Sequence, residues 1–155
     1  ASFVPLLVYI ALAEHLGVLK DDTTKALASN TGYYILLSAP VLVLLGHMFP
    51  VWLKFKGGKG VATLFGLAFA MNVYVGAVCA VIWLSVFAIT RISSLSALLM
   101  LIGYCAGMIY WMPPFTYTSL IITALVTFKH QDNIRRLIKG EEPRFGKPAN
   151  AKEAA

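Results

Sequence analysis

Charged side chains are scarce in this chain: 13% of its 155 residues are Asp, Glu, Lys or Arg, whereas 59% are hydrophobic. Between Gly60 and Lys129 the only charged residue is Arg91. The mean hydropathy of +0.75 is too high for a soluble domain of this length. The sequence therefore predicts an all-α, polytopic integral membrane protein built as a helical bundle.

Cysteine is nearly absent, with Cys79 and Cys105 in separate apolar segments and no Cys or His at metal-ligand spacing. Both are interpreted as small buried hydrophobes, and the sequence calls for no metal and no other cofactor. The net charge is +6, but the basic residues lie at the ends of apolar runs rather than on a polar domain. This placement favours lipid headgroups and anionic substrates as partners, and no nucleic acid.

Long apolar runs define the membrane segments. The run from Val61 to Thr90 is too long for one untilted span, so it is either one long tilted helix or two segments. The distribution of basic residues favours two, with a break near Met71 and Asn72 into a short helix, Val61–Met71, and a full one. About six segments are expected, at residues 2–18, 33–53, 61–71, 72–90, 94–111 and 114–128.

Basic residues decide the orientation of these segments. With the break near Asn72, Lys20 and Lys25 fall outside and the other eleven of the thirteen basic residues fall inside. Both termini of the chain are then cytoplasmic. Two parts are expected: a transmembrane helical domain at residues 1–128, and a basic cytoplasmic tail at 129–155 that continues the last helix.

A polar hinge, Lys54–Thr63 with the sequence KFKGGKGVAT, interrupts the apolar chain. Consecutive glycines let backbone N–H groups turn toward one point, and a helix beginning at Val61 would add its unpaired N–H groups beside them. Lysine adds a mobile charge, so the hinge is interpreted as a phosphate site. It lacks the spacing of a nucleotide P-loop. The alternative is a short cytoplasmic turn whose lysines only set topology.

Two further polar groups are candidates for chemistry. His47 lies within the second apolar run; it either hydrogen-bonds a neighbouring helix or faces the same pocket as Lys59, since Pro50 bends or ends the helix between them. At the end of the last run, His130, Asn133 and Arg136 recur at helical spacing and project from one side. The alternative is an ordinary basic helix end lying on anionic lipid.

These two stretches carry a family resemblance. Residues 46–63, GHMFPVWLKFKGGKGVAT, are similar to the second motif of the bacterial acyl-phosphate:glycerol-3-phosphate acyltransferases, the PlsY family, and residues 130–142, HQDNIRRLIKGEE, resemble its third motif. The family's first motif and the span before it have no counterpart here, so we expect an N-terminally incomplete chain. The resemblance implies a multi-pass protein of the bacterial cytoplasmic (inner) membrane with its active face in the cytoplasm.

The resemblance also implies an activity: transfer of a fatty acyl group from acyl phosphate to the 1-hydroxyl of sn-glycerol 3-phosphate, giving lysophosphatidic acid and phosphate in phospholipid synthesis. Catalytic roles fall to His47, Lys59, His130 and Asn133, and Glu142 is expected to be structural. The residues expected to bind substrate are Lys56, Gly57, Gly58, Lys59, Gly60, Thr63 and Arg136.

Partners and alternatives complete the expectation. The partners are glycerol 3-phosphate, acyl phosphate and membrane lipids, with functional coupling to an enzyme that produces acyl phosphate. The proton of the glycerol hydroxyl goes either to a histidine or to a phosphate oxygen of a substrate. The alternative function is a small-anion or phosphate-ester transporter, in which a half-length helix aims its N-terminus at the substrate.

Overall fold

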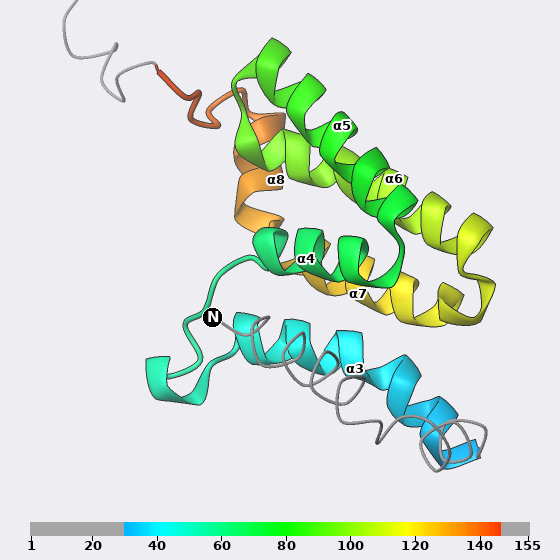
Figure 1. Cartoon of the computed structure of the whole chain (residues 1–155). Helices are drawn as coiled ribbons and strands as arrows, with labels where there is room; N and C mark the ends of the chain where they lie inside the picture. The colour runs from blue at the N-terminus through cyan, green and yellow to red at the C-terminus, as the bar shows by residue number, and fades with distance from the viewer. Residues whose placement is uncertain (1–29, 147–155) are drawn as a thin grey trace, which may run out of the picture. The chain divides into compact units, whose positions relative to one another are not determined.

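The computed structural model describes residues 30–146, all of whose regular elements are helical (Figure 1). The predicted first segment at 2–18, Lys20, Lys25 and the last nine residues lie outside the described range. The chain divides into two compact units, with the boundary between Leu67 and Ala68. Each unit is described by itself.

The first unit contains α3, Asn30–Met48, the 3₁₀ turn η1, Val51–Leu53, and the start of α4, Val61–Met71. The second apolar segment was predicted to run to about Leu53, with Pro50 bending or ending the helix, and α3 does end at Met48. Pro50 has no N–H to donate and takes an extended conformation, φ −66° and ψ 127°, which stops the helix.

The predicted break of the long apolar run is confirmed. Helix α4 ends at Met71 and α5, Val73–Thr90, begins one residue after Asn72. The Asn72 side-chain oxygen accepts hydrogen bonds from the N–H groups of Tyr74 (2.9 Å) and Val75 (3.2 Å). An N-cap of this kind begins a new helix, so Asn72 separates the short helix from the full one.

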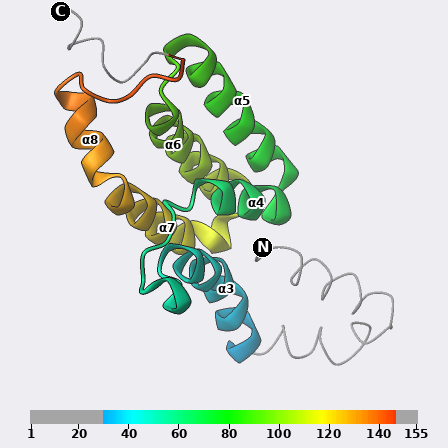
Figure 2. The same cartoon turned by 90° about the vertical axis from the view of Figure 1, so that its left-hand side faces the viewer.

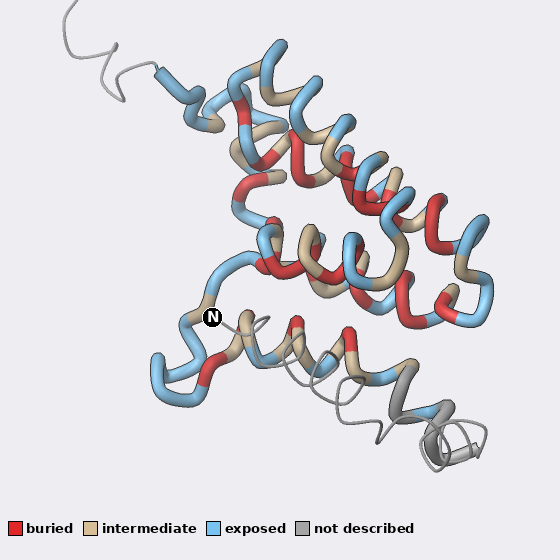
Figure 3. Tube along the Cα trace, viewed as in Figure 1, coloured by how far each residue is buried: buried red, intermediate tan, exposed pale blue. Residues whose placement is uncertain are grey.

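The second unit is built on α6, Ser93–Trp111, which packs against α5 on one side and α7, Thr116–Lys129, on another. Figure 3 shows buried residues along α6, where Tyr104, Met100 and Met108 are fully enclosed. Large apolar side chains of α5 such as Val81, Leu84 and Ile89 are instead exposed. This suits a helix that faces lipid.

Two of the described helices, Val73–Thr90 and Ser93–Trp111, are long and apolar enough to cross a bilayer. Leu37–Leu53 and Val61–Met71 are shorter apolar stretches. The total of six segments and their orientation stay predictions. Between α6 and α7, the turn η2, Pro113–Phe115, reverses the chain, and its two consecutive prolines disfavour continuation of the helix.

The basic tail was predicted to continue the last helix, and the structure interrupts this helix at His130. Helix α7 ends at Lys129, and α8, Gln131–Ile138, starts in a new direction after a turn at His130 (Figure 2). The His130 N–H is shared between the carbonyls of Thr127 (3.0 Å) and Val126 (3.2 Å), which closes α7. The division into a transmembrane domain, residues 1–128, and a cytoplasmic tail, residues 129–155, stays a prediction.

Candidate functional site

The glycine-lysine loop, residues 54–60, folds back onto the end of α3. A Cβ atom at Gly57 would lie 2.6 Å from the Met48 carbonyl oxygen and 2.5 Å from Pro50 Cδ, and would also meet the His47 carbonyl oxygen. Two of these neighbours are backbone atoms that cannot rotate away. Only glycine therefore fits at residue 57 in this arrangement.

The next residue brings the loop to His47. A Cβ atom at Gly58 would lie 2.8 Å from His47 Nε2, so the backbone of the loop lies against the Nε2 edge of the imidazole ring. The structure thus joins two features that the sequence had placed eleven residues apart. Lys56 and Lys59 on either side of the glycine pair are exposed, so their ammonium groups are open to an anion.

Gly60 ends the loop and begins α4. Its φ of +82° is in the left-handed region that favours glycine. Its carbonyl accepts from the Leu64 N–H at 2.8 Å, which makes it the residue before the helix. The first N–H groups of α4, up to that of Thr63, have no carbonyl within the helix to bind, as at every helix start. The predicted helix start at Val61 is confirmed, and the Thr63 side chain is buried.

A second polar cluster, in the second unit, centres on Glu142. One carboxylate oxygen, Oε1, accepts hydrogen bonds from Ser94 Oγ and from Asn133 Nδ2, both at 2.5 Å. The other, Oε2, accepts from Arg136 Nε at 2.7 Å. The Glu142 side chain is only 6% exposed. The carboxylate therefore joins the start of α6 to one side of α8.

These partners decide the protonation of Glu142. Partial burial raises the pKa of the carboxyl, but hydrogen bonds from Ser94, Asn133 and Arg136, together with the Arg136 charge, outweigh this effect. The net result is a pKa below the ordinary value for Glu. Glu142 is therefore a carboxylate at neutral pH, which suits a brace and does not suit an acid catalyst.

Asn133 and Arg136, two further residues of the predicted site, both lie on α8. Asn133 is buried, and Arg136 is partly exposed. Within the described part of the chain, the Arg136 side chain is bonded through Nε alone, so its terminal amino groups can meet an anion. Their spacing on one side of the helix agrees with the sequence-based prediction.

His130 is 1% exposed at the junction of α7 and α8. Its Nδ1 lies 2.7 Å from the Val126 carbonyl oxygen. Because a carbonyl only accepts, Nδ1 carries the proton in this contact. In the neutral ring, Nε2 is then the nitrogen with a lone pair, and it is the one that can accept a proton.

Sequence reasoning missed Ser94. A serine at the start of a helix is ordinarily interpreted as a cap, and Ser93 and Ser94 both stand there. The partner of Ser94 is 48 residues away. Its polarity in an apolar segment was the only available signal, and that signal does not name a partner.

The helices and their two polar clusters define an integral membrane protein of the α-helical class, with basic groups gathered beside a glycine loop. Comparison with known proteins identifies the family. Residues 3–140 match the glycerol-3-phosphate acyltransferase family, and the chain belongs to it.

Individual relatives agree with this assignment. A glycerol-3-phosphate acyltransferase of Wolbachia pipientis wMel is 45% identical over 116 residues, covering 75% of this chain and 60% of the relative. One from Francisella philomiragia is 38% identical over 150 residues, covering 96% of this chain and 72% of the relative.

A solved structure is similar as well. The glycerol 3-phosphate form of PlsY (YgiH), an integral membrane glycerol 3-phosphate acyltransferase, is 33% identical, with a TM-score of 0.71 over 80% of this chain and 64% of PlsY. Its lysophosphatidic acid form gives a TM-score of 0.65 at 32% identity. The chain spans roughly 50–60% of the length of several of the curated relatives it matches.

Proposed function

We propose that this protein transfers a fatty acyl group from acyl phosphate to the 1-hydroxyl of sn-glycerol 3-phosphate, giving lysophosphatidic acid and phosphate. The observation that carries the proposal is the glycine-lysine loop, which lies against Nε2 of His47 with Lys56 and Lys59 exposed. Family membership supports it, as do the two bound forms in which the related PlsY was solved.

The loop would bind the phosphate of glycerol 3-phosphate. Lys59 supplies a full positive charge, the backbone N–H groups of Gly57, Gly58 and Gly60 supply directed donors, and Lys56 adds long-range attraction. The start of α4 adds further N–H groups, with Thr63 as a hydroxyl donor or as a brace of this helix start. Every one of these groups favours an anion, and none is a base.

Acyl phosphate is already activated, so the protein does not have to activate the acyl group. The glycerol hydroxyl oxygen attacks the acyl carbonyl carbon, the bond from this carbon to the phosphate oxygen breaks, and phosphate leaves with its electron pair. The protein must align the two anions and neutralise their repulsion. Asn133 and Arg136 would orient the substrate or the leaving phosphate.

The hydroxyl proton has two candidate destinations. His130 has its proton on Nδ1 facing Val126, which leaves Nε2 of the neutral ring as an acceptor. His47 is the second candidate base. A phosphate oxygen of a substrate is the alternative acceptor. Near-normal turnover in both His130→Gln and His47→Gln would exclude a protein base.

The glycine-lysine loop with His47 and the cluster around Glu142 would serve one reaction, because each belongs to a stretch that resembles a motif of the same family. We place the enzyme in the bacterial inner membrane, with its active face toward the cytoplasm. Acyl phosphate would reach it from an enzyme that produces this labile compound. The product would remain in the membrane as a precursor of phospholipid.

The test is acylation of radiolabelled glycerol 3-phosphate by the purified chain in lipid with acyl phosphate as donor. Lys59→Ala should abolish measurable turnover, and Lys54→Ala, which changes an exposed lysine of the same loop, is the matched control. Turnover that survives Lys59→Ala would contradict the assigned phosphate site.

A transporter is the second candidate, favoured by one observation. Helix α4 has only 11 residues and is separated from α5 by the Asn72 cap, as in proteins that aim a half-length helix at a substrate. Accumulation of glycerol 3-phosphate inside sealed vesicles without acyl donor would support transport. Acylation without accumulation would exclude it.

A further inference from the structure

The chain reverses after α8 into a short irregular segment, Gly140–Gly146, here named the strap. Gly140 has φ +72°, its N–H donates to the Leu137 carbonyl at 3.1 Å, and the Glu141 N–H donates to the Arg136 carbonyl at 2.8 Å. This is the hydrogen-bond pattern of a glycine-terminated helix. The reversal carries Glu142 back toward the side of α8 that holds Asn133.

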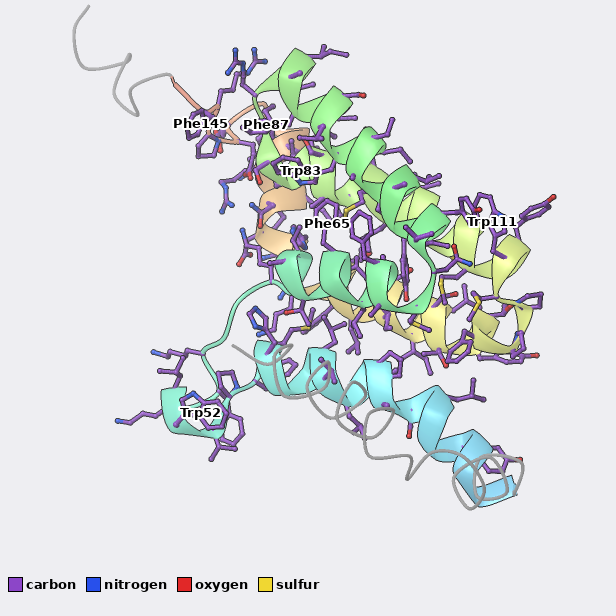
Figure 4. All side chains as sticks on the ribbon, viewed as in Figure 1. Trp52, Phe65, Trp83, Phe87, Trp111 and Phe145 are labelled. Atoms are coloured by element: carbon purple, nitrogen blue, oxygen red, sulfur yellow. The ribbon has the colours of Figure 1, made fainter. Side chains whose placement is uncertain are left out.

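The far end of the strap is attached to the turn between α5 and α6. The Phe145 N–H donates to the Arg91 carbonyl at 2.7 Å. The Phe145 ring lies 5.9 Å, centroid to centroid, from the ring of Phe87 at an angle of 57° (Figure 4). Phe87 in turn stacks on Trp83 at 4.9 Å. An aromatic anchor on α5 thus receives the end of the strap.

The turn between α5 and α6, to which the strap is attached, is closed by hydrogen bonds of its own. Arg91 has φ 59°, and its N–H donates to the Phe87 carbonyl at 2.9 Å, which closes α5. Three residues later, Ser94 holds the Glu142 carboxylate. The strap is therefore attached at two neighbouring points: through Phe145 to the α5–α6 turn and through Glu142 to the start of α6.

We propose that Phe145 is a positioning residue, which clasps the α5–α6 turn so that Glu142 stays where it orients Asn133 and Arg136. This inference rests on the proposed function, because that function gives Asn133 and Arg136 their task. Phe145 touches no substrate in it. Phe145 is 72% exposed, so the contribution of its burial to the fold is small, and its effect is expected at the site.

The expected signature is a change in substrate affinity. Release of the clasp lowers the fraction of molecules in which Arg136 is oriented, and the apparent affinity for the substrate falls by that fraction. Loss of an aromatic contact of this kind should raise the KM for glycerol 3-phosphate by about two- to ten-fold. The kcat should change little, because bound substrate selects the oriented form.

The experiment measures KM and kcat for Phe145→Ala, Phe87→Ala and the double variant in lipid. Each single variant should raise KM, and the double should raise it no further than either single, because both remove one contact. Phe145→Tyr keeps the ring and should restore the wild-type KM. Ile138→Ala and Ile89→Ala remove exposed apolar side chains near the strap and on α5, and should leave KM unchanged.

A wild-type KM in Phe145→Ala, or a double variant whose rise is the product of the two single rises, would overturn the positioning role. In either result a wild-type enzyme that acylates glycerol 3-phosphate leaves the proposed function standing. A wild-type protein that neither acylates glycerol 3-phosphate nor binds it by calorimetry would overturn both proposals together.

Discussion

Replacing Glu142 with Gln tests the second cluster at its centre. Gln keeps one oxygen, which can still accept hydrogen bonds from Ser94 and Asn133. Its NH₂ group would then face the Arg136 N–H, and two donors cannot form a hydrogen bond with each other. The change therefore removes one charge-assisted hydrogen bond of 2.7 Å. Such bonds contribute about 1.5–3 kcal/mol, and the 41% exposure of Arg136 reduces this to about 1–2 kcal/mol.

The assay is thermal unfolding of the purified protein in lipid or detergent. A loss of about 1–2 kcal/mol lowers Tm by about 2–8 °C for a chain of this size. Glu141→Gln is the matched control, because Glu141 is the preceding residue and is exposed. It should unfold at the wild-type temperature, since an exposed carboxylate contributes little.

The pH dependence gives a second reading of Glu142. Burial raises the pKa of its carboxyl, but the hydrogen bonds from Ser94, Asn133 and Arg136, together with the Arg136 charge, lower the pKa by more. The pKa of Glu142 in the folded protein is therefore below its value in the unfolded chain. The unfolded state then binds the proton more readily. The stabilisation is fully present above the ordinary carboxyl pKa and is lost as pH falls through the lowered one.

The Tm difference between wild type and Glu142→Gln should therefore be largest at neutral pH and shrink in acid. An equal difference at neutral and acid pH would refute the carboxylate brace. So would a Glu141→Gln variant that behaves like Glu142→Gln.

Three glycine substitutions and one label test the first unit and the topology. Gly57→Ala should lower Tm, since its Cβ would meet backbone carbonyls, whereas Gly46→Ala, inside helix α3 with open space around it, should lower neither Tm nor activity. Gly58→Ala should keep the fold, because the His47 ring can rotate away, and lose about tenfold in kcat/KM; a wild-type kcat/KM would contradict the loop-histidine contact. Val73→Cys, in a chain without its native cysteines, should react with an impermeant maleimide from the outer face; labelling only from the cytoplasm would contradict the six-segment topology.

Much of the fold followed from local patterns. The short helix from Val61 to Met71 was predictable because one bilayer crossing has a limited length and Asn is a strong N-cap. The end of α3 beside Pro50 was predictable, because proline has no N–H to donate to a helix, although the apolar composition continues to Leu53. The turn at His130 was missed because the sequence there remains compatible with a helix.

By itself, the sequence determined that this is an all-α membrane protein, where its apolar helices break, which residues carry charge, and which family motifs it holds. These properties depend on composition and on spacing along the chain. Only the tertiary structure decided that Gly58 lies against His47, that Ser94 shares the carboxylate of Glu142 with Asn133 and Arg136, and that Phe145 reaches Phe87. Such contacts join residues up to 58 positions apart, and they arise from the packing of helices, which no local pattern specifies.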